Sequence, residues 1–153
     1  MIEDRAVIVW SKMMIQQLDR TALKVNQAAI IGLLALGFVL SQPLLVAFVA
    51  AVMALGTVDG RLALFQRLYR DGLRPAGLLR PDLHTELAAP HRFAQGMGAG
   101  VLGLALIGFA LGAPNLGWGL CLLVIGLAAV NLFFGFCAGC FVYFQLERLR
   151  SAR

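Results

Sequence analysis

The stretches AIIGLLALGFVL (29–40) and VLGLALIGFALG (101–112) decide the fold class of this chain. Neither has a polar face at the helical period of about 3.6 residues, which a helix of a soluble bundle needs. Of the 153 residues, 60% are hydrophobic and only 14% are charged, far on the apolar side of an ordinary soluble domain. The sequence therefore predicts an all-α integral membrane protein.

Two long tracts carry no charged side chain. No Lys, Arg, Asp or Glu occurs at residues 25–58 or at residues 93–145. Each tract exceeds the roughly 20 residues of one transmembrane helix, and turn-forming residues interrupt each near its middle, at Pro43 and around Pro114. We therefore expect a four-helix bundle of two helical hairpins. The predicted membrane helices cover residues 25–41, 43–57, 91–111 and 118–137.

The basic residues predict the orientation, because Lys and Arg in short loops stay on the cytoplasmic side. They precede the first helix, separate the second from the third and follow the fourth, whereas the two hairpin tips carry none. Both termini are therefore expected in the cytoplasm. The net charge of +5 follows from this topology and from anionic lipid, so no nucleic-acid partner is expected. The residues are Arg5, Lys12, Arg20 and Lys24; Arg61, Arg67, Arg70, Arg74, Arg80 and Arg92; and Arg148, Arg150 and Arg153.

The chain divides into a flanking segment, residues 1–24, and a transmembrane domain, residues 25–153. The flanking segment mixes apolar and charged residues, and this pattern predicts an amphipathic helix lying along the membrane interface. An ordered docking segment for a partner is the alternative. We expect the second and fourth helices to extend into the cytoplasm and residues 73–90, which contain three prolines, to form an ordered loop.

The sequence GFCAGC (135–140) holds two of the three cysteines. Counting residues from the hairpin tip places Cys137 level with Arg92, at the cytoplasmic end of the fourth helix. Cys137 and Cys140 share a helical face at a spacing compatible with a disulfide. Neighbouring His91 and Arg92 are expected to tune the thiols, whereas a position near the C-terminal end of their own helix opposes activation.

Small and polar residues near this site suggest helix packing. Gly96 with Gly100, and Gly135 with Gly139, form GxxxG pairs, which we expect to bring the third and fourth helices together. Asn131 inside the fourth helix is expected to form an interhelical hydrogen bond.

Three interpretations of the cysteine pair stay open: packing of small apolar side chains, thiol redox chemistry, and a metal or haem site that recruits His84 or His91. No cofactor is required by the first two. No Ser-His-Asp set or phosphate loop supports hydrolysis or phosphoryl transfer. The candidate functions are exchange with a thioredoxin-like protein and, as the alternative, a non-enzymatic accessory or structural subunit of a larger membrane complex.

Four stretches resemble a bacterial membrane-protein family catalogued as domain of unknown function 4395, over roughly residues 18–148. The resemblance is most specific in RFAQG (92–96) and GFCxGC (135–140). It implies a small multi-helix protein of the bacterial inner membrane without an assigned activity, and it implies thioredoxin-like proteins as companions. The stretches are LDRTALKVNQ (18–27), LYRDGLRPAGLLRPD (68–82), PHRFAQGMG (90–98) and NLFFGFCAGCFVY (131–143).

Overall fold

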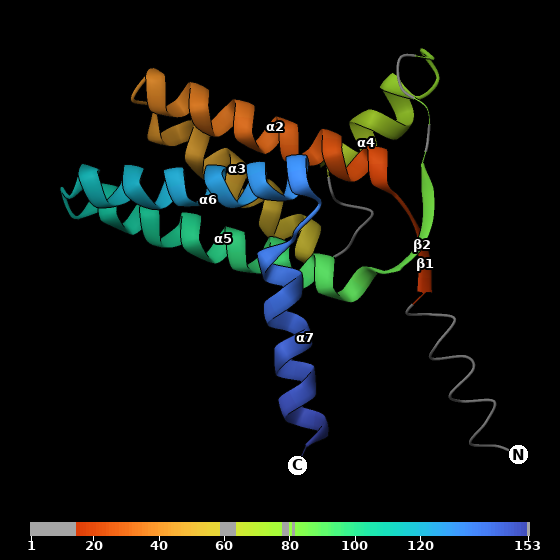
Figure 1. Ribbon diagram of the computed structural model, residues 1–153. Coiled ribbons are helices and arrows are strands. Elements are labelled where there is room, and N and C mark those ends of the chain that lie inside the picture. Colours follow the sequence, from red (N-terminus) through yellow and green to blue (C-terminus); the bar gives the residue numbers. More distant parts are fainter. Residues whose placement is uncertain (1–14, 59–63, 78–79, 81, 153) are drawn as a thin grey trace, which may run out of the picture.

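A computed structural model describes residues 15–58, 64–77, 80 and 82–152 (Figure 1). The predicted interfacial helix lies mostly before residue 15 and so outside this part of the chain. The elements are, in order, β1 (Ile15–Asp19), α2 (Arg20–Val39), α3 (Pro43–Val58), α4 (Leu64–Leu68), the π-helical turn η2 (Tyr69–Leu73), β2 (Leu83–Leu87), α5 (Ala88–Ala110), α6 (Pro114–Phe134) and α7 (Ala138–Ser151).

Three helices, α2, α5 and α6, are long and apolar enough to cross a membrane. The apolar helix α3 has 16 residues, about 24 Å, and is shorter than a hydrocarbon core of about 30 Å. Large apolar side chains lie exposed on this helical array, among them Leu44, Leu111 and Phe133, each more than three-quarters exposed. Exposed apolar surface on this scale indicates contact with lipid, which agrees with the expected helical membrane protein.

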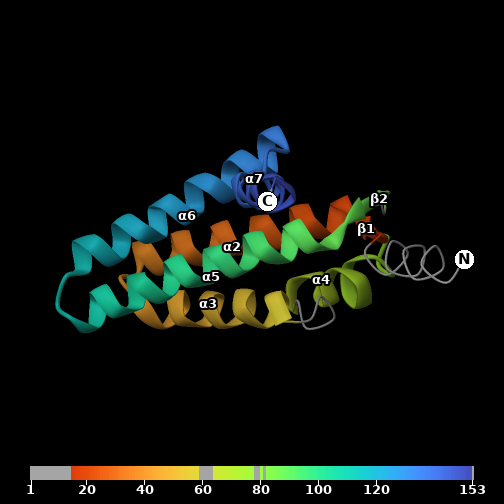
Figure 2. The ribbon, with the colours of Figure 1, turned by 90° about the horizontal axis from the view of Figure 1, so that it is seen from below.

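The four long helices lie side by side (Figures 1 and 2). α5 packs against α3 and α6, and α2 packs against α3 and α6. The tight connections fall where the sequence predicts interruptions. Ser41, with φ 52°, links α2 to α3, and Gly112, with φ 74°, links α5 to α6.

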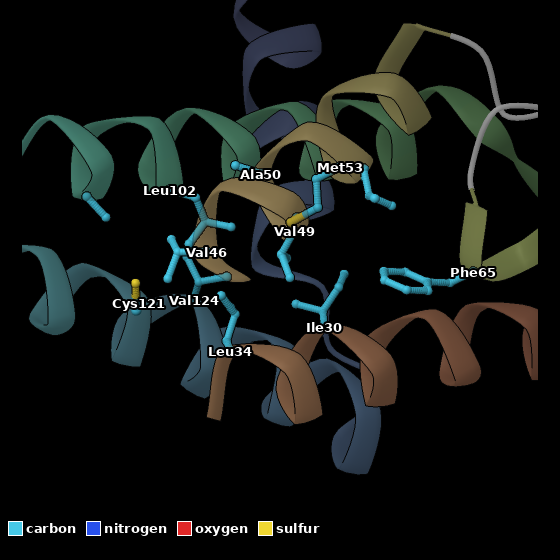
Figure 3. Packing of buried hydrophobic residues seen from close by; sticks show 12 residues of the cluster. Ile30, Leu34, Val46, Val49, Ala50, Met53, Phe65, Leu102, Cys121 and Val124 are labelled. Atoms are coloured by element: carbon cyan, nitrogen blue, oxygen red, sulfur yellow. The ribbon is translucent and has the colours of Figure 1, made fainter. Parts of the chain in front are cut away.

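The core is formed by aliphatic side chains that meet between these helices (Figure 3). Ile30 and Leu34 of α2 lie against Val46 and Val49 of α3, and all four are almost fully buried. The third cysteine, Cys121 of α6, is fully buried in the same cluster. Cys121 therefore packs in the core, unlike the pair formed by Cys137 and Cys140.

Two short strands lie in segments for which a helix and a loop were expected. β1 pairs antiparallel with β2, and Gln17 lies opposite Thr85. The prediction of a helix up to residue 24 and of a loop up to residue 90 missed this ribbon, because each strand is short and its partner is distant in sequence. α2 leaves the ribbon at the Asp19–Leu83 pair and α5 leaves it at the Ile15–Leu87 pair, so the two helices start at opposite ends of the ribbon (Figure 1). Helix α2 also begins earlier than expected, at Arg20.

The end of the fourth predicted helix is also corrected. α6 ends at Phe134, three residues follow, and the chain restarts as α7 at Ala138. α7 leaves the array of long helices steeply: Figure 2 views it nearly end-on, while the long helices lie across the view. No residue of α7 is buried, and its side chains include both Phe144 and Arg148. This composition suits a helix at a membrane surface.

The second helix, α3, is described up to Val58. Residues 59–63 lie outside the described part, and the next element is α4, followed directly by η2. Phe65 and Tyr69 of this segment are buried, and α4 packs against α2. The expected surface extension is thus a short, docked helix.

Asp19 joins the ribbon to α2, and this contact yields a stability prediction. Its Oδ1 accepts hydrogen bonds from the backbone N–H of Thr21, at 3.0 Å, and of Asp82, at 3.1 Å. Replacing the carboxylate by a methyl group leaves both donors without this acceptor. We expect Asp19→Ala to lower the free energy of unfolding by about 1–2 kcal/mol, as measured by denaturant titration in detergent micelles.

Asp19→Asn is the matched control, because its amide oxygen can still accept both bonds. It should lose less than half as much stability as Asp19→Ala. Equal losses in the two variants would show that the two hydrogen bonds to Asp19 Oδ1 contribute nothing to the stability.

Candidate functional site

The local sequence Gly135-Phe136-Cys137 explains why the helix breaks at the cysteine motif. Gly135 takes the left-handed conformation, with φ 68°, and its N–H bonds the carbonyl of Asn131, which closes α6. A residue with a Cβ adopts this conformation only at a cost, so glycine suits the position. Cys137 then takes an extended conformation, with φ −96° and ψ 105°, and forms the N-cap of α7.

The cysteine pair therefore occupies the start of a helix. The Cys137 Sγ accepts a hydrogen bond from the backbone N–H of Cys140, at 3.3 Å. The expectation that the pair lies toward a helix C-terminus is wrong, because Gly135 divides the predicted helix just before the first cysteine. A helix N-terminus carries partial positive charge and stabilises a thiolate, so the electrostatic conclusion is reversed.

The hydrogen bonds around Cys137 favour its ionised form. A hydrogen bond from the Cys140 thiol, supported by the backbone N–H groups of Cys140 and Gly139, lowers the pKa of Cys137 to about 6 from an ordinary value of 9.0. Partial burial acts in the opposite direction but does not prevail. Cys137 therefore ionises more readily than an ordinary thiol, and both cysteines are half-buried and not joined in a disulfide.

His91 lies with the two thiols. The nearest ligand atoms of His91, Cys137 and Cys140 all lie within 4.8 Å of one another. Two thiolates and an imidazole are ligands that Zn²⁺ or Cu⁺ accepts. The other candidate ligand, His84, lies on β2 opposite Leu18. In the part of the chain that the structure describes, the group consists of these three residues, one fewer than a structural zinc site uses.

Arg92, the second residue predicted to tune the thiols, instead contacts the end of α3. Its Nε donates a hydrogen bond to the carbonyl of Thr57, at 3.0 Å, and its Nη2 donates to the carbonyl of Val58. These are the last carbonyls of α3, which lack partners within that helix. A guanidinium at a helix C-terminus is favourable, so Arg92 caps α3 while its neighbour His91 lies at the thiols.

The four predicted packing glycines separate into different roles. A Cβ on Gly96 would lie 3.0 Å from Thr57 Cγ2, so Gly96 faces α3 rather than the fourth helix. A Cβ on Gly100 would meet nothing within 4 Å, and Gly135 ends α6. Only Gly139 brings the expected third and fourth segments together, through α7. The GxxxG spacing alone did not distinguish these positions.

Helix α7 is held on the start of α5 at two points. A Cβ on Gly139 would lie 2.5 Å from Ala94 Cβ and 2.6 Å from Ala94 Cα, so the two helices approach to backbone distance. One turn further along α7, the rings of Tyr143 and Phe93 lie with centroids 5.6 Å apart. These contacts fix the cysteine turn beside His91, which belongs to the same turns of α5.

Two hollows meet at the cysteine turn. A small cavity of about 100 Å³ extends among α2, α3, α5 and α6, and a groove of about 770 Å³ lies between the first turns of α2 and the last turn of α6. Gln27, His91, Asn131 and Cys137 line both. Asn131, predicted as an interhelical contact, is therefore a lining residue of the site.

One wall of the groove was not predicted from the sequence. Arg20, Lys24 and Gln27 of α2 line it, as does Asp82. The spacing i, i+4, i+7 places the three α2 residues on one helical face, so a signal was present. This face looks toward the cysteine turn because α2 packs against α6, a tertiary contact that the spacing alone does not give.

Comparison with protein families gives a match. A family model described as domain of unknown function 4395 matches residues 18–148, which is most of the chain and includes both thiols and the α2 wall of the groove. Curated proteins and solved structures give no significant match.

Proposed function

The chain belongs to the family described as domain of unknown function 4395, and from that premise we propose that it is a membrane thiol-disulfide partner of a soluble thioredoxin-like protein. The observation that carries the proposal is the Cys137 sulfur at the N-terminus of α7, where it accepts a hydrogen bond from the backbone N–H of Cys140 and has a lowered pKa. A low-pKa thiol with a second thiol three residues later is the arrangement that dithiol exchange uses.

We further propose that α2, α3, α5 and α6 form a four-helix bundle in the bacterial inner membrane. The distribution of Lys and Arg supports placing both termini in the cytoplasm. Four crossings return the chain to its starting side, so the cysteine turn, the ribbon and α7 share that side. α7 then lies along the membrane surface, which its exposed Phe141 and Leu149 and its charged Arg148 favour.

The exchange balances atoms and electrons without a further reactant. The Cys137 thiolate attacks the disulfide of the partner, forms a mixed disulfide and releases one partner thiolate. The Cys140 thiol loses its proton and attacks the Cys137 sulfur, which releases the second partner thiolate and leaves a Cys137–Cys140 disulfide. The reverse sequence takes two electrons from a reduced partner into the chain.

Trapping with a thioredoxin-like probe tests this function. We expect Cys140→Ser to accumulate a mixed disulfide through Cys137, because the resolving thiol is missing, while Cys137→Ser accumulates at least about tenfold less under the same conditions. Non-reducing electrophoresis and peptide mass spectrometry identify the linked cysteine.

Cys121→Ser is the matched control, since the buried Cys121 thiol should contribute no mixed disulfide. The proposal is abandoned if neither Cys137 nor Cys140 forms a mixed disulfide and both stay reduced under oxidant challenge. Stoichiometric metal in the purified protein, lost with either cysteine, would instead support the metal interpretation.

A further inference from the structure

We propose that the groove between α2 and α6 binds the head group of a lipid-soluble quinone, which accepts two electrons from the Cys137–Cys140 dithiol. The inference rests on the proposed thiol exchange and names the membrane substrate of the same site. Its basis is a ligand-sized hollow with a reactive thiol pair in its lining, at the ends of helices that are apolar enough to lie in lipid.

The groove, unlike the inner cavity, is large enough to hold a quinone ring. A cavity of about 150 Å³ holds one benzene molecule, so the inner cavity of about 100 Å³ is too small for a substituted ring. The groove, at about 770 Å³, falls in the usual range of small-molecule sites. Cys137 lines both hollows and Cys140 lines the groove, so a ring bound in the groove lies beside the sulfurs.

The lining of the groove fits the two ends of a quinone. Lys24, Gln27 and Asn131 offer hydrogen-bond donors, which the carbonyl oxygens of a quinone ring accept. Phe133 and Phe134, about four-fifths exposed at the end of α6, form apolar surface along which an isoprenoid tail can run into lipid. Polar and apolar side chains line the groove in comparable measure, as the polar head group and the apolar tail of a quinone require.

The thiols favour a redox lipid over an ordinary anionic lipid. Arg20 and Lys24 would suit a phosphate head group as well as a quinone, but a phosphate makes no use of a thiolate at the groove lining. A quinone does: the Cys137 and Cys140 sulfurs give up two electrons as their S–S bond forms. The quinone takes these electrons with two protons, one from the Cys140 thiol and one from solvent, and leaves as the quinol.

The step also gives the exchange a direction. A stabilised thiolate makes a dithiol a weaker reductant, so the Cys137–Cys140 disulfide readily accepts electrons from a thioredoxin-like dithiol. Passing them to a quinone restores the disulfide. Electrons then run from the soluble partner through the cysteine pair into the membrane.

The test uses the reduced full-length protein in lipid nanodiscs without oxygen. The probe is decylubiquinone, whose fully substituted ring disfavours stable alkylation of thiols. We expect one quinol and one Cys137–Cys140 disulfide per protein, followed by quinone absorbance and by alkylation mass mapping. Cys137→Ser and Cys140→Ser should form no quinol.

Gln27→Leu tests quinone binding in the groove while leaving both thiols in place. In this single-turnover reaction, KM is the quinone concentration that gives half the maximal rate of disulfide formation. Losing the Gln27 donor should raise this KM about five- to tenfold and leave the maximal rate little changed. The same substitution at Gln42, which is exposed at the α2–α3 tip, is the matched control and should leave KM unchanged. An unchanged KM in Gln27→Leu would refute the groove as the site.

The outcomes distinguish the two proposals. Mixed-disulfide formation with a thioredoxin-like probe but no quinol formation overturns the quinone inference and leaves the proposed function standing. Failure of both reactions overturns both. Saturable binding of anionic lipid that involves Lys24, with no quinol formed, assigns the groove to a phosphate head group and likewise refutes the inference.

Discussion

Alkylation of Cys137 by iodoacetamide is expected to follow a titration with a midpoint of about pH 6, where an ordinary thiol follows one near 9.0. The pKa is lowered, so the thiolate is present above the midpoint and is lost as the pH falls through it. Relative to an ordinary thiol, Cys137 should react about fourfold faster at pH 7 and about twentyfold faster at pH 6, after allowing for the weaker nucleophilicity of a low-pKa thiolate. Residue-resolved mass spectrometry measures both rates.

Cys140→Ala tests the physical cause of that shift. It removes the thiol that donates to Cys137, the largest contribution to the lowered pKa, and keeps the backbone N–H. The midpoint should therefore rise to a value between about 6 and 9.0. Cys121, fully buried, should stay unmodified throughout and reports an intact fold. A midpoint near 9.0 in the unaltered protein would contradict the N-cap arrangement.

Gly139→Ala is expected to force α7 away from α5. Its new Cβ would lie 2.5 Å from Ala94 Cβ and 2.6 Å from Ala94 Cα, and backbone atoms cannot yield as a flexible side chain can. Overpacking of this kind costs about 1–3 kcal/mol. Moving α7 also shifts Cys137 and Cys140 relative to His91, so the protein should lose stability and mixed-disulfide formation together.

Gly100→Ala is the matched control for this substitution. Its Cβ would meet nothing within 4 Å on an exposed face of α5, and alanine favours a helix over glycine. It should leave stability unchanged or slightly raised. Both variants are compared by thermal unfolding in detergent and by trapping with the thioredoxin-like probe. Wild-type values for Gly139→Ala would mean that α7 does not depend on the contact with Ala94.

The long helices could be predicted because each needs only local information. Uncharged, apolar tracts interrupted at Pro43 and Gly112 leave few alternatives for a chain in lipid. The strands could not be predicted in the same way. β1 has the sequence IQQLD and β2 has LHTEL, five residues each, and neither buries enough by itself to specify a partner dozens of residues away.

The candidate site shows how one residue decides a chemical conclusion. The spacing of Cys137 and Cys140 predicted two cysteines on one helical face, whereas Cys137 is the extended N-cap of α7 and only Cys140 lies within the helix. A glycine inside an apolar run is compatible with both a continuous helix and a break. Gly135 breaks the helix, so the two cysteines lie at the start of α7 rather than at the end of α6. The role of Arg92 was equally hidden, because the carbonyls of Thr57 and Val58 reach it only through tertiary packing.

The steep departure of α7 determines where an attached domain would sit. Its 14 residues extend about 21 Å, so a domain fused after Ser151 starts that far to the side of the cysteines. A flexible Gly/Ser linker of about 14 residues has an end-to-end distance near 20 Å and would match this span. A thioredoxin-like domain tethered in this way would meet the thiols at millimolar effective concentration, whereas a linker of a few residues would hold it out of reach.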